Sequence, residues 1–383
     1  MTFLTLAIIA GVFIVVTISI YEKFWDKKLT ASVSFEHKVV DEGQKLFLYE
    51  QIENRKLLPL PALLLKFEMD RELRCSDCMD TSITDKMYRT DSLSVMPYTR
   101  VTRHVELLAT QRGLYTIDDI QFVSSDILFH SHLVKTLPNR AKLYVYPSRS
   151  KFTQLTPICT RMYGDSITNT MFRQDSMEFR GIRDYTQADS LRKINWKASA
   201  KTGDWKVNQY HDSTSRRLTI FLNITQTGVL KYFDLVEESI RIARNFVEEF
   251  VKLGIPVRII SNGTDRLSKE EVVVQEGAGP AHIDTCLKKL ARINVLAGGR
   301  SISEIIREYK TVNTGYNGEV SLLISAEETE EIVHSYMEYA SGGGSANWII
   351  PIHSFMQKGE GANRSGGLIH TDYLVVEELE AKI

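Results

Sequence analysis

The chain has 383 residues, a length that predicts about two domains of ordinary size. Hydrophobic residues make up 43% of the sequence and charged residues 25%, which are values of a globular protein. The 47 basic residues are balanced by 48 acidic residues, so the composition gives no reason to expect broad electrostatic binding to nucleic acid, and any basic patch must be local.

The N-terminal segment has the features of a membrane anchor. Residues 2–21 carry no charged side chain, and about 20 apolar residues in a helix span the hydrocarbon core of a bilayer. A cleaved signal peptide is the alternative, but the basic start and the small-residue cleavage site that it requires are missing. An uncleaved single-pass anchor over residues 1–22 is therefore favoured.

The residues after this span predict its orientation. Lys23, Lys27 and Lys28 follow it closely, and Trp25 is placed to lie at the interface. By the positive-inside rule these lysines put the main body in the cytoplasm, so the expected location is the cell membrane with a cytoplasmic body.

Residues 31–147 have the pattern of an all-β domain. Short runs such as 45–53 and 101–108 alternate apolar and polar residues, and turn signals such as Asp41-Glu42-Gly43 and Arg112-Gly113 separate them. Six or seven half-buried strands of this kind predict a β-sandwich of immunoglobulin-like type.

The four cysteines are too few and too scattered for a disulfide scaffold. Cys75 and Cys78 form one Cys-x-x-Cys pair, and a zinc site would need a second pair of ligands. Ordinary thiols are the favoured interpretation, with a metal half-site or a redox pair as alternatives.

Residues 148–217 are expected to be a linker followed by an unusual polar segment. From Phe179 to Tyr210 the charged, aromatic and glycine residues follow no helix or strand period, which predicts a loop-rich surface whose charges pair with one another. In one interpretation these pairs are structural and Trp196 packs under the sheet. In the other, arginine and tryptophan form an interaction hot spot, and the two interpretations are compatible.

Residues 218–383 alternate strand and helix patterns. The apolar run 218–225 predicts a buried parallel strand, and residues 232–253 carry apolar side chains at helical spacing before Gly254 ends the helix. Further alternation to the end of the chain predicts an open, mostly parallel doubly wound sheet with helices on both faces.

Within the polar segment lie Arg183, Tyr185, Asp189, Arg192, Trp196 and Lys197. Their spacing resembles that of the bacterial membrane-anchored proteins of the domain-of-unknown-function fifty-eight family, which carry a von Willebrand factor A-like domain. The pattern usual in that family is Arg-x-Tyr, Gly-Asp, then Arg-x-Ile-Asp-Trp-Lys-x-x-Ala-Arg. The chain departs from it at Ala188, Asn195 and Lys201. The matching residues that we predict to form an interaction motif are Arg183, Tyr185, Asp189, Arg192, Trp196 and Lys197.

The resemblance also indicates where a metal ion would bind. In von Willebrand A domains the loop after the first strand usually holds Mg²⁺ through Asp-x-Ser-x-Ser, and this chain has Asn223, Thr225 and Thr227 at those positions. A neutral amide in place of the carboxylate lowers affinity for a hard divalent cation, so no metal and no other cofactor is expected. A divalent-metal-dependent binding or catalytic module is the alternative.

No Ser/His/Asp or Cys/His arrangement can be assigned to one site, so the sequence predicts a non-enzymatic interaction or assembly protein. The resemblance implies partnership with an AAA ATPase of the MoxR type, and with a transglutaminase-like membrane protein. Both partners would suit work in envelope-related complex maturation. Nucleic acid is not an expected partner.

Overall fold

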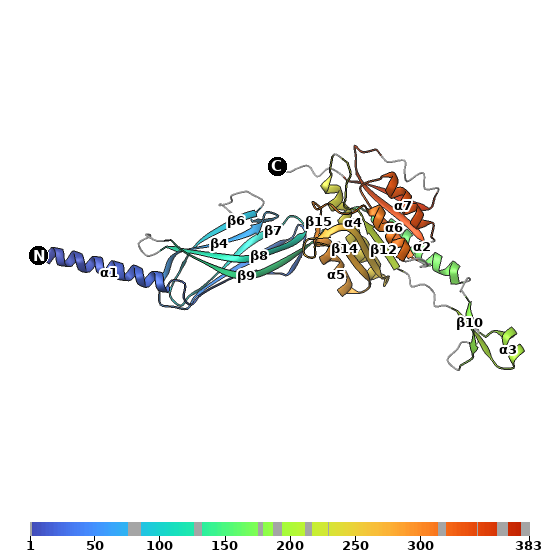
Figure 1. The fold of residues 1–383 in the computed structure, drawn as a ribbon, viewed down its shortest axis with the longest axis horizontal. Coiled ribbons are helices and arrows are strands. Elements are labelled where there is room, and N and C mark those ends of the chain that lie inside the picture. Colours follow the sequence, from blue (N-terminus) through green and yellow to red (C-terminus); the bar gives the residue numbers. More distant parts are fainter. Residues whose placement is uncertain are drawn as a thin grey trace. The chain divides into compact units, whose positions relative to one another are not determined.

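The computed structural model describes residues 2–75, 86–125, 132–174, 179–186, 194–210, 217–228, 230–312, 319–342, 344–357 and 367–376. The chain divides into two compact units, unit 1 (Met1–Ser148) and unit 2 (Arg149–Ile383) (Figure 1). The described residues are rich in strands and contain seven helices, so the predicted mixture of α and β structure is confirmed.

The N-terminal helix α1 (Thr2–Phe24) covers the predicted anchor. Among its described residues, large apolar side chains such as Phe3, Ile9 and Phe13 are exposed. No helix in the described part of the chain is both long enough and apolar enough to cross a membrane. The anchor therefore stays a prediction.

Unit 1 contains two sheets that share one hydrophobic core. The first is antiparallel, in the order β1 (Leu29–Phe35), β3 (Lys45–Asn54), β7 (Arg100–Ala109) and β5 (Leu73–Cys75). The second has the order β2 (Val39–Asp41), β9 (His132–Tyr146), β8 (Gly113–Ser125), β4 (Leu60–Asp70) and β6 (Lys86–Val95). Alternate residues of β3 and β4, such as Leu48, Ile52 and Leu65, point into that core as period-two strands require.

Cys75, at the end of β5, is disulfide-bonded in the structure. The prediction of an ordinary thiol is therefore wrong for this residue. Cys78 lies outside the described residues.

Unit 2 is built on a seven-stranded sheet (Figure 1). Its main order is β14 (Glu271–Gly277), β13 (Val257–Asp265), β12 (Arg217–Leu222), β16 (Glu319–Ile324), β17 (Ser345–His353) and β18 (Ile369–Val376), and β15 (Ile293–Asn294) pairs with β13. Neighbouring strands in the order β13, β12, β16, β17 and β18 are parallel, whereas β14 and β15 pair with β13 in the antiparallel direction. A mostly parallel sheet agrees with the prediction.

Helices pack on this sheet as its apolar faces require. On one face, α6 (Ile302–Val312) and α7 (Glu330–Ala340) share a core with Phe221 of β12 and Trp348 of β17. The helices α4 (Phe233–Lys252) and α5 (Pro280–Ala291) pack against each other, and α4 also contacts β12 and β17. Gly254 follows α4 with a φ of 76°, a left-handed conformation that glycine adopts without strain.

Four elements in the segment 148–217 differ from the expected linker and loop. The helix α2 (Leu155–Gln174) packs against α4, and its Arg161 is ion-paired with Asp372 of β18 at 2.6 Å. The polar segment forms the antiparallel strands β10 (Phe179–Asp184) and β11 (Lys206–Tyr210), with the short helix α3 (Trp196–Thr202) before β11. We call the described residues 179–186 and 194–210, which contain these three elements, the arm.

Candidate functional site

The carboxyl ends of the parallel strands are the first place to look for a site in unit 2. Strand β12 lies between β13 and β16. The chain therefore forms the neighbour of β12 on one side first, as β13, and the neighbour on the other side later, as β16. Ligands of open α/β sheets bind at such a switch point. Asn223 follows β12 here, and Ser325 follows β16.

Asn223 is buried and its amide orientation is fixed by its neighbours. Its Oδ1 accepts a hydrogen bond from the Thr225 backbone N–H at 3.1 Å, so its Nδ2 faces Ser325 Oγ and donates to it at 2.9 Å. Ser325 in turn donates to the Glu327 carbonyl at 2.7 Å. An amide is required at position 223, because the only proton of the Ser325 hydroxyl is already donated to Glu327.

Asn262 of β13 closes the place where a cation would bind. Its Oδ1 accepts from the Ile224 N–H at 2.9 Å, which turns its Nδ2 toward Asn223 Oδ1 and Thr225 Oγ1, both at 2.8 Å. The two oxygen atoms that a metal ion would need therefore accept amide protons. Gly299 packs over this residue so closely that a Cβ would lie 2.0 Å from the Asn262 carbonyl oxygen.

Thr227, the third predicted metal candidate, lies apart from this cluster of amides. Its backbone N–H donates to Glu327 Oε1 at 2.9 Å, and its hydroxyl bonds the same oxygen. Among the residues that the structure describes, no group of three or more His, Cys, Asp or Glu side chains is arranged to hold a metal. The donor set at the strand ends does not fit a divalent cation.

Millimolar Mg²⁺ is expected to leave the thermal unfolding midpoint of the EDTA-treated protein unchanged, because the amide protons of Asn262 occupy the oxygen atoms of the cluster. Asn223→Asp is expected to lower the free energy of unfolding by about 1–3 kcal/mol, since a carboxylate oxygen would replace the donor that Ser325 requires. Differential scanning fluorimetry measures both effects. If Mg²⁺ raised the unfolding midpoint and Thr225→Ala abolished that effect, the expectation would be contradicted and the metal-dependent alternative would be favoured.

Four of the six predicted motif residues lie on the arm. Arg183 is in β10, Tyr185 follows it, and Trp196 and Lys197 begin α3. Asp189 and Arg192 lie outside the described residues. The structure therefore brings part of the motif together on one small antiparallel element.

Local hydrogen bonds explain why this polar sequence forms the arm. Asn195 caps α3 by accepting from the Ala198 N–H at 2.9 Å, and asparagine is as good a helix N-cap as aspartate. Ser199 accepts from the Lys206 N–H at 2.8 Å and donates to the Asn195 carbonyl, which fixes α3 to β11. Ile194 and Val207 pair as an isolated bridge and are both buried.

The two tryptophan side chains of the arm, Trp196 and Trp205, are exposed. Trp196 is 66% exposed and Trp205 is 52% exposed, and the Trp205 ring meets Tyr185 edge-on at 5.3 Å between centroids. The interpretation in which Trp196 packs under the sheet is therefore wrong. Among the charges, Lys206 forms the expected pair with Asp184, whereas the Arg183 guanidinium donates to the Asp184 carbonyl at 3.0 Å.

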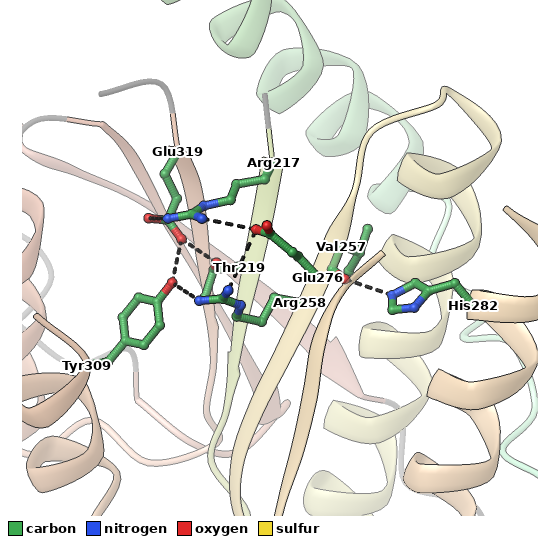
Figure 2. Close-up of polar contacts among 8 residues, drawn as sticks. All are labelled: Arg217, Thr219, Val257, Arg258, Glu276, His282, Tyr309 and Glu319. Carbon is green, nitrogen blue, oxygen red and sulfur yellow. Dashed lines mark hydrogen bonds and ion pairs between the residues drawn. The ribbon is translucent and has the colours of Figure 1, made fainter. Parts of the chain in front are cut away.

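A second polar cluster lies at the amino ends of the parallel strands, and Figure 2 shows its contacts. Arg217, at the start of β12, bonds Glu319 Oε2 at 3.2 Å and Glu276 Oε2 at 3.0 Å. Glu319 also accepts from Tyr309 at 3.1 Å and from Thr219, and both Arg217 and Glu319 are buried.

The same cluster reaches β13 and α6 (Figure 2). Arg258 donates to the Tyr309 hydroxyl at 2.7 Å and lies 3.6 Å from Glu276 Oε2. Clustered ionisable groups often mark an active site, but here they bond one another across four strands and a helix. The arrangement stabilises the amino ends of these strands, and no local pattern in the sequence predicted it.

Unit 1 also contains a buried ionic cluster. Glu50 of β3 is 1% exposed and accepts from Arg89 Nε at 3.1 Å, while Arg89 also pairs with Asp91 of β6. Arg103 reaches Asp91 Oδ1 at 3.1 Å, and no donor among the described residues is hydrogen-bonded to Glu50 Oε2. Burial, followed by the nearby Asp91 charge, raises the pKa of Glu50 to about 7.

Comparison with known proteins gives limited guidance. No family model matches the chain. It is 21% identical over 242 residues to "Uncharacterized protein YeaD" of Bacillus subtilis (strain 168), an alignment that covers 62% of this chain and 56% of the relative. The chain thus spans little more than half the length of that relative.

Solved structures similar to part of the chain include a non-cellulosomal cohesin from Archaeoglobus fulgidus, with 14% identity and a TM-score of 0.22. Another is the CARDB domain of the PF1109 protein from Pyrococcus furiosus, with 15% identity and a TM-score of 0.20. Each match covers 30% of this chain and 91% of the other chain. TM-scores at this level carry no argument about fold or function.

Proposed function

We propose that this protein is a non-enzymatic, membrane-anchored interaction or assembly protein whose arm binds a partner protein. The carrying observation is the exposure of Trp196 and Trp205, in contrast to Trp25 and Trp348, which are buried. Exposed tryptophan next to arginine is the composition of interaction hot spots. The closed amide cluster at the strand ends supports a role without metal chemistry.

The resemblance to the domain-of-unknown-function fifty-eight family supports the choice of partner. On that basis the partner is an AAA ATPase of the MoxR type, and a transglutaminase-like membrane protein is a second partner in the same envelope-related process. The same resemblance supports an immunoglobulin-like type for unit 1 and a von Willebrand A-like type for unit 2.

The proposed location is the cell membrane, with α1 as a single-pass anchor and the body in the cytoplasm. The exposed apolar side chains of α1 support the anchor, and Lys23, Lys27 and Lys28 support the orientation. The lysines are the support for this orientation. The disulfide of Cys75 argues against it, because disulfides are more common in oxidising compartments than in the cytoplasm.

Trp196→Ala is expected to weaken binding of the purified MoxR-type ATPase of the same genome by about fivefold or more, because truncation of a central tryptophan costs more than about 1 kcal/mol. Biolayer interferometry with the detergent-solubilised full chain measures the dissociation constant. Leu296→Ala is the matched control, because Leu296 is an exposed apolar residue of unit 2 outside the arm. Equal affinities of wild type and Trp196→Ala would contradict the assignment of the arm as the docking surface.

A further inference from the structure

Three turns meet at one end of unit 1, where α1 joins the sheets. Residues 25–28 connect α1 to β1, residues 55–59 connect β3 to β4, and residues 96–99 connect β6 to β7. Strand register places them together, since Leu29 pairs with Asn54, Glu53 pairs with Arg100, and Leu60 pairs with Val95. We call these three turns the rim.

Hydrogen bonds tie the three turns of the rim into one surface. The Arg55 N–H donates to the Lys28 carbonyl at 3.0 Å, and the Tyr98 N–H donates to the Lys56 carbonyl at 3.3 Å. The buried Asn54 side chain donates to the Leu58 carbonyl at 2.9 Å and to the Met96 carbonyl at 3.1 Å. The rim is therefore a defined surface.

The rim is also fixed to the end of α1. Tyr21 and Trp25 are buried in the core of unit 1, and the Tyr21 hydroxyl lies 3.1 Å from Ser124 Oγ. Lys56 donates from Nζ to the Trp25 carbonyl, and Asp26 is ion-paired with Lys135 at 3.0 Å. Any membrane that contains α1 would therefore lie next to the rim.

Large apolar side chains project from the rim into solvent. Leu57 is 76% exposed, Met96 is 59% exposed and Tyr98 is 71% exposed. Tyr98 has a φ of 55° and Lys28 a φ of 54°, a conformation that costs free energy in residues other than glycine. Folding alone gains nothing from an exposed tyrosine in a strained turn, so a ligand for this surface is the better explanation.

The rim and the end of α1 carry excess positive charge. Glu53 is ion-paired with Arg55 and Arg100, at 2.9 and 3.3 Å. With Asp26 paired to Lys135, the segment 22–28 keeps the three lysines Lys23, Lys27 and Lys28 against one further acidic residue of that segment, Glu22. Apolar side chains and an aromatic residue beside several lysines are the composition of a surface that binds anionic lipid.

We propose that the rim rests on an anionic lipid bilayer, with Leu57, Met96 and Tyr98 inserted at the headgroup level. The proposal rests on the membrane anchor proposed above. It adds that unit 1 is held against the bilayer by a second contact and has a fixed orientation to it.

The test uses the full chain reconstituted in vesicles of phosphatidylcholine, alone or in an equal mixture with phosphatidylglycerol. A bimane label is placed by Leu57→Cys or Tyr98→Cys, under native conditions in which Cys159 and Cys286 are buried. Gln44→Cys is the matched control, because Gln44 is an exposed residue at the opposite end of β3, about 30 Å away. Quenching by brominated acyl chains reports contact with lipid, and flotation reports the anchor separately.

With phosphatidylglycerol present, quenching at positions 57 and 98 is expected to exceed quenching at position 44 several-fold, and Lys27→Gln with Lys28→Gln is expected to reduce the excess. Quenching at 57 and 98 no greater than at 44, in a chain that floats, would overturn the rim contact and leave the anchor intact. Equal quenching at positions 57 and 98 in vesicles with and without phosphatidylglycerol would overturn the preference for anionic lipid. A chain that does not float would overturn the anchor and the rim contact together.

Discussion

Arg217→Met is expected to lower the free energy of unfolding of unit 2 by about 3–5 kcal/mol, because it leaves the buried carboxylate of Glu319 without its cation. Arg217 and Glu319 are both less than one-tenth exposed, and the lost pair joins β12 to β16. Hydrogen exchange of the β12 and β16 amides, followed by mass spectrometry, is expected to accelerate by about a hundredfold or more. This readout isolates unit 2 within the full chain.

Lys252→Met is the control for Arg217→Met, since Lys252 and Glu249 form an exposed pair on α4 and such pairs contribute about 0–1 kcal/mol. Adding Glu319→Gln to Arg217→Met is expected to recover part of the loss by removing the unpaired charge. If Arg217→Met lowered the free energy of unfolding no more than Lys252→Met does, the buried cluster would not be what stabilises this end of the sheet.

Glu50→Gln is expected to stabilise unit 1 at pH 8 and to have little effect at pH 5. The folded protein raises the pKa of Glu50 from 4.5 to about 7, so it binds the proton more tightly than the unfolded chain does. Stability from this group is thus fully present below pH 4.5 and is lost as the pH rises through 7. The shift corresponds to a difference of up to about 3 kcal/mol at pH 8, because one pKa unit equals about 1.4 kcal/mol.

Hydrogen exchange of the β3 and β6 amides at several pH values, corrected for the intrinsic exchange rate, measures this effect. Glu53→Gln on the same strand is the control, and it is expected to act in the opposite direction because its hydrogen bond with Arg55 lowers the pKa of Glu53. A Glu50→Gln variant that is less stable than wild type at pH 8 would show that the ionised carboxylate is net stabilising.

Local patterns in the sequence were enough to predict most regular elements. The helix predicted over 232–253 is α4 (Phe233–Lys252), because its apolar stripe and Gly254 are local signals. The continuous apolar run at β12 predicted a buried parallel strand for the same reason. By contrast, α2 has no clear apolar stripe and was expected to be linker, since its packing against α4 involves distant residues.

The arm was missed as regular structure because its residues satisfy one another through specific hydrogen bonds. Asn195 caps α3 and Ser199 bonds β11, and no periodic pattern records either contact. An Asn-x-x-x-Ser spacing before a Gly was the available local signal for the short helix.

The sequence by itself determined the uncharged N-terminal segment, the balance of charge and most strands and helices of the two units, because these depend on composition and on short-range periodicity. It also identified Asn223, Thr225 and Thr227 as the residues that follow the first parallel strand. Glu50 lies on the same core-facing side of β3 as Leu48 and Ile52, and this period-two alternation in the sequence indicates that Glu50 is buried. Only the tertiary structure decided that Asn262, from another strand, donates its amide protons to Asn223 and Thr225. It likewise paired Arg217 with Glu319 and Glu50 with Arg89, because contacts between residues far apart in sequence depend on how the strands align.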